Sequence, residues 1–298
     1  MTHPEEIPKQ PQKDNVADKF KFQVVYLLPI LASMLFGLVC SLVLLPQASL
    51  VIPEAPIPPE TSGTDWGIAI YFVVFLAIGA TVFYLLLKHK KRRIITGVIV
   101  LALTVAVLLL SLVFLAALTP YISFLNNWLV IILFAGAFAA LFDLAIFRLG
   151  NKTRNIAVIL MGGALGMFFG YIIIGGISFW CAILILVFLS VYDIFAVYKG
   201  PVGKIAQSSG LDQLPGLSFS FKEIQMGLGD LVFYSMLTGT MIFGFPQSFL
   251  PVIASMVGII VGSVITFYML EKKSIFPGLP FPIFLGLVFG LVVGFLLM

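Results

Sequence analysis

Charged residues are scarce in this chain, and their scarcity limits the class of protein it can be. Of the 298 residues only 10% are charged, whereas 61% are hydrophobic, and the mean hydropathy is +1.15. Soluble domains carry about 25% charged residues, so this composition excludes a soluble globular protein. The apolar residues occur in long runs, and a bilayer needs roughly 20 such residues for each helical crossing. We therefore predict an all-α, polytopic membrane protein.

Histidine and cysteine are nearly absent as well. The two histidines are His3, in the polar N-terminal segment, and His89, in a basic connection. Because neither lies in an apolar run, the sequence excludes a membrane-embedded H-E-x-x-H zinc site and an intramembrane serine nucleophile with a histidine base. Cys40 and Cys181 are expected to be inert small hydrophobic residues, and a disulfide between them is the less favoured alternative. No metal site and no cofactor are predicted.

Nine apolar runs are long enough to cross a bilayer as helices. Their bounds, uncertain by a few residues, are 24–45, 67–87, 94–118, 128–147, 156–174, 177–198, 228–245, 249–270 and 282–298. We expect residues 1–23 to form a cytoplasmic tail and 24–298 to form one nine-helix domain. Segment 199–227 would then be a cytoplasmic loop, and the proline-rich segment 46–66 an extended outer connector.

Glycines repeat at four-residue spacing in three of these runs, a pattern typical of tightly packed membrane helices. They are Gly162, Gly166 and Gly170, then Gly258 and Gly262, then Gly286, Gly290 and Gly294.

The 17 basic residues all fall in alternate connections, beginning with the segment before the first run. Because Lys and Arg collect on the cytoplasmic side of a membrane, this distribution predicts a cytoplasmic N-terminus and an external C-terminus. The isoelectric point of about 9.0 is thus a consequence of topology, and no nucleic-acid partner is expected.

Two aspartates lie at matching depth in neighbouring runs. Asp193 stands six residues before Lys199, and Asp230 stands eight residues after Lys222. Helical rise places both carboxyls about 9–12 Å inside the cytoplasmic boundary, on antiparallel helices. An ionisable side chain at this depth is costly and indicates function by default. We predict that the two carboxyls face each other and share one proton, and the alternative is two unrelated acids with local donors.

Asp143 is the third acid in an apolar run. It lies about 7.5 Å along a helix from Arg148, so the sequence favours an interfacial carboxylate or one paired with Arg148 or Arg154.

Glycines and prolines occur at the same depth as the aspartate pair. Gly227 and Gly229 flank Leu228 just before Asp230, where they weaken the helix start and leave the backbone open to an extended peptide. Residues 277–280, Pro-Gly-Leu-Pro, are followed by Pro282 and should stay extended, because each proline lacks an amide donor. An ordinary helix boundary and an ordinary turn are the structural alternatives.

These residues carry a family resemblance. Tyr192-Asp193, Gly227-Leu228-Gly229-Asp230 and Pro277-Gly278-Leu279-Pro280 resemble the YD, GxGD and PAL motifs of the presenilin and signal peptide peptidase family of intramembrane aspartyl proteases. The order of the motifs and the helix count fit too, so the resemblance extends over nearly the whole chain. Gly278 stands where the family usually has alanine.

The resemblance implies that Asp193 and Asp230 are catalytic. It also implies that Tyr192, Gly227, Leu228, Gly229 and residues Pro277, Gly278, Leu279 and Pro280 shape the active site or contact substrate. The predicted orientation is similar to that of presenilins, and the short loop between the catalytic runs resembles that of compact microbial homologues, such as archaeal ones, that work without accessory subunits.

The implied activity is hydrolysis of peptide bonds in single-span transmembrane substrates within the lipid bilayer, by water activated between two carboxyls. A homo-oligomer is left open. The alternative from another class is a proton- or cation-coupled transporter or leak channel, in which Asp193, Asp230 and Asp143 form a relay. Cleavage of a peptide bond distinguishes the two.

Overall fold

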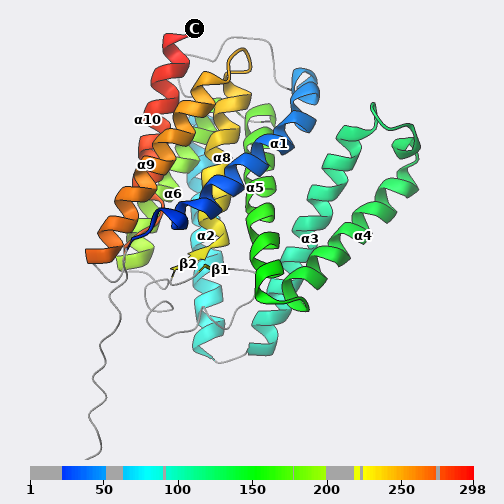
Figure 1. Ribbon diagram of the computed structural model, residues 1–298, viewed down its shortest axis with the longest axis horizontal. Helices are drawn as coiled ribbons and strands as arrows, with labels where there is room; N and C mark the ends of the chain where they lie inside the picture. Colours follow the sequence, from blue (N-terminus) through cyan, green and yellow to red (C-terminus); the bar gives the residue numbers. More distant parts are fainter. Residues whose placement is uncertain are drawn as a thin grey trace, which may run out of the picture.

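The computed structural model describes residues 22–51, 63–89, 92–176, 178–198, 218–221, 224–272 and 276–298 (Figure 1). Within these ranges the chain forms nine α-helices and one two-stranded sheet. The helices are α1 (Leu28–Val51), α2 (Gly63–Lys88), α3 (Arg92–Leu118), α4 (Trp128–Phe147), α5 (Asn151–Gly176), α6 (Phe179–Tyr198), α8 (Leu228–Gly244), α9 (Leu250–Lys272) and α10 (Pro280–Leu296). Single 3-10 turns, Val24–Leu27 and Ser123–Asn126, precede α1 and α4.

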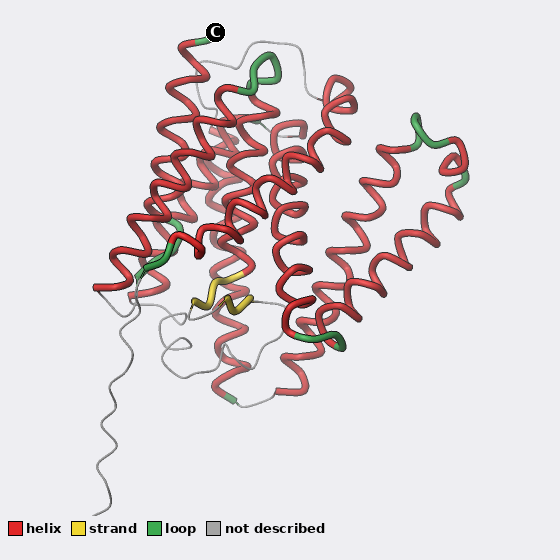
Figure 2. Tube along the Cα trace, viewed as in Figure 1, coloured by secondary structure: helices red, strands yellow, loops and turns green. Residues whose placement is uncertain are grey.

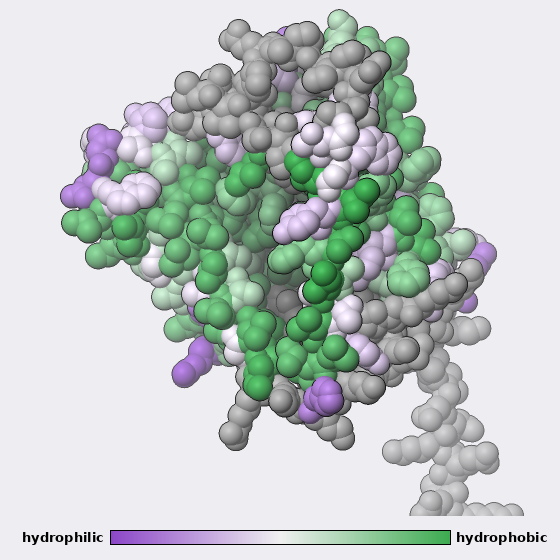
Figure 3. All heavy atoms as spheres, turned by 180° about the vertical axis from the view of Figure 1, so that it is seen from behind, coloured by the Kyte–Doolittle hydropathy of each residue, from purple (hydrophilic) through white to green (hydrophobic). Residues whose placement is uncertain are grey.

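The prediction of an all-helical, multi-pass membrane protein is confirmed. In the described ranges seven helices are long and apolar enough to cross a membrane, and α8 and α10 are shorter apolar helices. Many large hydrophobic side chains are exposed, including Leu133 at 72% and Leu101 at 67%. Figure 3 shows hydrophobic side chains over most of the described surface on one face. In water such a surface would be unfavourable, whereas in hydrocarbon it is the expected one.

Helix α8 forms the centre of the bundle. It packs against α1, α5, α6, α9 and α10, and nearly all of its side chains are buried. Helices α3 and α4 form a hairpin at one side of this body, where α4 contacts α5 (Figure 1). Because α8 is surrounded by protein along its length, its residues are positioned by neighbouring helices more than by lipid.

The repeated glycines allow close helix contacts, as predicted. On α5, a Cβ added at Gly162 would lie 2.7 Å from the Cβ of Leu231, and one at Gly170 would lie 2.9 Å from the carbonyl carbon of Gly239. The α5 glycines therefore face α8. The glycines of α9 approach α10, and those of α10 approach both α8 and α9. Backbones come this close only because no side chain intervenes.

A β-hairpin, which the sequence did not predict, leads into α8. Strand β1 (Ser218–Phe221) pairs antiparallel with β2 (Ile224–Gly227), and Ser218 lies opposite Gly227. Gly227 is both the last strand residue and the N-cap of α8, with extended backbone angles of φ −72° and ψ 145°. Figure 2 shows the hairpin toward the end of the bundle away from the C-terminus.

Several helix ends differ from the predicted ones, among them the start of α5, which is at Asn151 and not at 156. Helix α1 continues through Pro46 to Val51 and α2 begins at Gly63, so the prediction of an extended connector over 46–66 is wrong at both ends. Pro46 lacks an amide donor, yet α1 continues for five residues beyond it. Helix α10 starts at Pro280, and its N-cap residue Leu279 already has helical angles of φ −81° and ψ −35°, so the prediction that 277–280 is extended is wrong at 279 and 280. The first four amides of a helix have no intrahelical acceptor, so Pro280 and Pro282 fit its first turn.

The two cysteines are free, which rules out the disulfide alternative. Residues 1–21 of the predicted tail lie outside the described residues. Residues 199–217, which make up most of the predicted loop 199–227, lie outside them too.

Candidate active site

Asp193 and Asp230 come together at one end of the bundle. Asp193 lies in the second half of α6, and Asp230 lies in the first turn of α8. The two helices are in contact, and the two carboxyls are near enough to interact electrostatically. The matching depth that was predicted from helical rise thus corresponds to proximity in the fold.

The backbone of the Pro-Gly-Leu-Pro segment supplies donors to Asp193. The amide of Leu279 donates to Oδ2 of Asp193 at 3.0 Å, and the amide of Gly278 also faces this carboxylate. Leu279 is buried, at 5% exposure. A carboxylate in an apolar environment is tolerated when such donors compensate for lost water.

The same segment touches Asp230. A Cβ built at Gly278 would lie 3.3 Å from Oδ2 of Asp230 and 3.4 Å from both Cγ and Oδ1. Gly278 and Leu279 are consecutive, so one dipeptide lies against both carboxyls. This dipeptide is the structural link between α6 and the start of α8.

Asp230 has a second contact, with the end of the hairpin. The amide of Gly227 faces its carboxylate, and Asp230 stands at the third position of α8 after the Gly227 N-cap. An acidic side chain at this position commonly returns to the N-cap amide and closes the first turn. Asp230 therefore also stabilises the junction between β2 and α8.

The remaining motif residues surround this centre. Leu228 is buried and Tyr192 is half-buried, next to Asp193 on α6. Gly229 is exposed, and a Cβ there would meet only the ring of Phe233, at 3.8 Å. Packing does not require a glycine at 229, so its absent side chain leaves an open backbone beside Asp230.

Asp143 lies elsewhere. It sits on α4, and the hydroxyl of Thr104 on α3 donates to its Oδ2 at 2.7 Å. Among the described residues it forms no ion pair with Arg148 or Arg154, so the predicted arginine partner is wrong. The Thr104 hydroxyl serves Oδ2, whereas Oδ1 of Asp143 is buried and has no hydrogen-bond partner among the described residues.

Sequence analysis overlooked one polar residue of this region. Tyr234, one turn after Asp230 on α8, is 2% exposed, and its hydroxyl donates to the carbonyl oxygen of Gly278 at 2.9 Å. The spacing of four residues from Asp230 was the available signal, since it places both side chains on one face of the helix.

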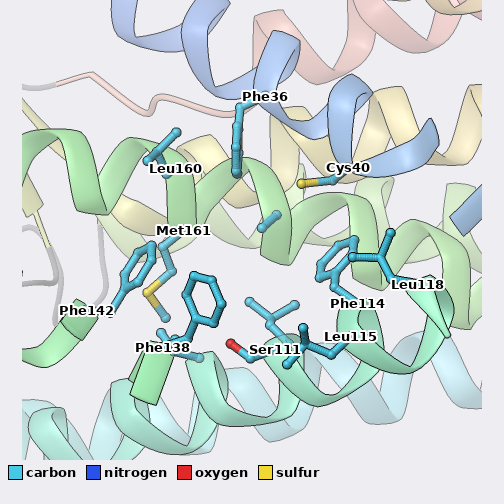
Figure 4. Close-up of a pocket in the computed structure, with 13 residues that line it drawn as sticks. Phe36, Cys40, Ser111, Phe114, Leu115, Leu118, Phe138, Phe142, Leu160 and Met161 are labelled. Carbon is cyan, nitrogen blue, oxygen red and sulfur yellow. The ribbon is translucent and has the colours of Figure 1, made fainter. Parts of the chain in front are cut away.

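An apolar cavity of about 240 Å³ lies between α1, α3, α4 and α5 (Figure 4). Its lining includes Phe36, Phe114, Phe138, Phe142 and Met161, and Ser111 supplies a hydroxyl. None of the motif residues lines it. Cys40 and Ser111 are the polar side chains of this otherwise apolar lining.

No group of three or more His, Cys, Asp or Glu side chains suited to a metal ion occurs in the part of the chain that is described. The two carboxyls and the amides that face them form the candidate site.

Comparisons with known proteins agree with the predicted family. The family model described as signal-peptide peptidase, presenilin aspartyl protease matches residues 27–212, and the presenilin model matches residues 205–298. The chain belongs to the signal-peptide peptidase and presenilin family of aspartyl proteases, as its motifs indicated. No curated protein matches it.

Solved structures support the fold. One presenilin family intramembrane aspartate protease, crystallised in space group C222, is 20% identical, with a TM-score of 0.63 over 93% of this chain and 100% of that one. A second, in space group P2, is 24% identical, with a TM-score of 0.58 over 91% and 96% of the two chains. At these identities the likeness concerns the arrangement of helices.

Proposed function

We propose that the chain is an intramembrane aspartyl protease of the GxGD type in which Asp193 and Asp230 form the catalytic pair. The observation that carries this proposal is the dipeptide Gly278-Leu279, which lies against both carboxyls at once. Two acids with unrelated structural roles have no reason to share one dipeptide. The family membership supplies the reaction class, and the contacts supply the residues.

The chemistry needs one proton between the two carboxyls. Two carboxyls in contact in a low-dielectric site titrate as a unit and hold one proton between them. The ionised member takes a proton from a water molecule, the resulting hydroxide oxygen attacks the scissile carbonyl carbon, and the protonated member donates to the carbonyl oxygen. The tetrahedral intermediate collapses when its nitrogen gains a proton, which releases an amine and a carboxylic acid.

The hydrogen bonds suggest how the roles divide. Asp193 accepts from the amides of the 278–279 segment, and these donors stabilise its ionised form. Asp230 accepts from one amide, that of Gly227, and lies 3.3–3.4 Å from the position that a Cβ on Gly278 would take. We therefore assign Asp193 as the base that activates water and Asp230 as the acid, with the roles reversed during collapse of the intermediate.

An extended substrate segment fits the open backbone beside the pair. A helical peptide hides its carbonyl groups, so a transmembrane substrate must unwind before cleavage. The hairpin ends at Gly227, immediately before α8, and a two-stranded sheet keeps one unpaired edge on each strand. Such an edge can add an extended peptide as a further strand. Gly227, Gly229 and residues Pro277 to Pro280 would then border the bound segment.

The proposed substrates are single-span membrane proteins with an external N-terminus, and accessory subunits are not required. The substrate class follows from the predicted orientation, and the independence from accessory subunits follows from the short loop between α6 and α8, which resembles that of compact microbial homologues. The N-terminus of this chain would be cytoplasmic and its C-terminus external, with the catalytic pair toward the cytoplasmic side.

The test is cleavage of a single-span model substrate by the purified, reconstituted chain, with and without an aspartyl-protease transition-state analogue. We expect two fragments whose masses sum to substrate plus one water, and the analogue should suppress both. Proton or cation flux across the same liposomes without any cleavage would overturn the proposal in favour of a transporter.

A further inference from the structure

Tyr234 and Asp193 bind opposite sides of one peptide group. The phenol of Tyr234 donates to the carbonyl oxygen of Gly278 at 2.9 Å. The N–H of the same peptide group, which belongs to Leu279, donates to Oδ2 of Asp193 at 3.0 Å. A continuous chain of hydrogen bonds therefore runs from α8, through the plane of one peptide bond, to the carboxylate on α6.

Both ends of this chain are firmly held. Tyr234 is 2% exposed, and Ser263 on α9, at 1% exposure, lies beside its hydroxyl. Leu279 is 5% exposed, and Pro277 before the dipeptide is buried too. Pro277 and Pro280 have no backbone N–H, so within residues 277–280 only Gly278 and Leu279 have a backbone donor. The orientation of the 278–279 peptide plane thus depends on a few contacts, and Tyr234 makes the one to its oxygen.

We propose that Tyr234 is a positioning residue, which fixes the 278–279 peptide group so that its N–H points at Asp193. The proposal rests on the catalytic assignment of Asp193. Hydrogen bonds in series polarise one another, so a donor on the carbonyl oxygen strengthens donation by the amide on the other side. Tyr234 also stands one turn from Asp230 on the same face of α8. A single helix then sets the position of one carboxyl directly and the hydrogen bonding of the other through a peptide plane.

A purely structural tyrosine would behave differently. If the phenol only satisfied a buried carbonyl, its loss would lower the stability of the chain and leave turnover unchanged. If it instead contacted substrate, its loss would raise KM. A positioning role predicts a lower kcat at nearly constant KM, because the substrate still binds while the base is less well ordered.

The experiment compares Tyr234→Phe with wild type in the full-length, reconstituted chain. The substitution removes one oxygen atom and keeps the ring. We expect kcat to fall roughly tenfold, as loss of one buried hydrogen bond predicts, with KM changed by less than about twofold. The matched control is Tyr171→Phe, whose ring packs on Phe243 with 5.4 Å between centroids. Phe243 is about 20 Å along α8 from Asp230, so this variant should keep the wild-type kcat.

A second measurement reports on the peptide group itself. In hydrogen exchange, a fragment covering residues 277–282 contains three prolines, so its backbone signal comes from Gly278, Leu279 and Phe281 alone. This fragment should exchange faster in Tyr234→Phe than in wild type or Tyr171→Phe. The measurement needs no substrate, and it therefore tests the hydrogen-bond chain even if no cleavage is found.

The outcomes are separable. Absence of cleavage by wild type with every substrate would overturn the proposed function. An active wild type together with a wild-type kcat in Tyr234→Phe would overturn the positioning role alone. A raised KM at constant kcat would do the same, since it would move the hydroxyl into substrate binding.

Discussion

Gly278 has no side chain and lies beside the carboxyl of Asp230. A methyl group there would contact Cγ and both oxygens of Asp230 at 3.3–3.4 Å, slightly tighter than ordinary packing. Most members of the family carry alanine at the matching position, so the carboxyl must be able to yield by a few tenths of an ångström. Glycine in this chain leaves that small volume to the carboxylate or to water.

Gly278→Ala should therefore retain cleavage within about threefold of wild type, with some gain if the tighter contact orders Asp230. Gly278→Val adds two further methyl groups toward the carboxylate and should lose nearly all activity. The measurement is kcat/KM on one model substrate for both variants. Equal activity of the valine variant would show that Gly278 does not border the reacting groups.

At the scale of elements, the contact between α5 and α8 positions the site. Helix α8 carries Asp230. The close approach of α8 to the glycines of α5 fixes the position of α8 in the bundle. A methyl at Gly166 would overlap the carbonyl oxygen of Val232 and lie 2.7 Å from the amide nitrogen of Met236. These are backbone atoms, which cannot move aside by a change of rotamer.

We expect Gly166→Ala to destabilise the chain by about 2 kcal/mol or more, because overpacking at a backbone contact forces the helices apart. Activity should fall with it, since α8 moves relative to α6. Gly136→Ala on α4 is the control, because a Cβ there meets nothing within 4 Å and alanine favours the helix by about 1 kcal/mol. Thermal unfolding in detergent measures both, and an unchanged Tm for Gly166→Ala would contradict the packing account.

The segment before α10 gives a second prediction at this scale. Leu279→Asn places a polar amide in a buried position beside Asp193, and Pro277→Ala restores a backbone donor and lets the helix start earlier. Both variants should cleave a model substrate at least tenfold more slowly, by our estimate from the loss of one or two ordered contacts. Leu279→Met keeps the volume and should remain active. Wild-type rates in the first two variants would reduce the segment to an ordinary turn.

The sequence predicted these elements unequally. The helices were found to within a few residues because hydrocarbon demands long apolar runs, and the aspartate pair followed from depth along two helices. The hairpin was missed because four-residue strands such as Ser218–Phe221 lie below any periodicity that composition can reveal. The start of α10 was misplaced because prolines were taken as helix breakers, although the first turn accepts them. Tyr234 was missed because its partner is a backbone carbonyl 44 residues away.

At the scale of the whole molecule, the hairpin and the basic helix ends that the structure describes share one end of the bundle. In Figure 1 the end of α2, the start of α3 and the hairpin lie toward the lower end, and the C-terminus lies at the upper end. If basic connections are cytoplasmic, the catalytic pair opens toward the cytoplasm and the C-terminus is external.

Topology can be tested by cysteine labelling in a chain from which Cys40 and Cys181 have been removed by Cys→Ala substitution. A cysteine at His89 should react with an impermeant reagent only from the cytoplasmic side, and one added after Met298 only from outside. The two positions serve as controls for each other, because they lie at opposite ends of the bundle. Labelling of position 89 from outside would show the inverse orientation. The expected substrates would then be membrane proteins with a cytoplasmic N-terminus.

The central claim is that Asp193 and Asp230 act as one proton-sharing device, and the most direct measurement is substrate cleavage by the Asp193→Asn and Asp230→Asn variants. Asn keeps the size and the acceptor oxygen, so each variant should fold and keep a Tm close to that of wild type. We predict that each loses at least about 1,000-fold in kcat/KM, because removal of either partner disables the same step. Asp143→Asn, the matched intramembrane control, should keep most of the activity. Substantial cleavage by either single variant of the pair would contradict the account.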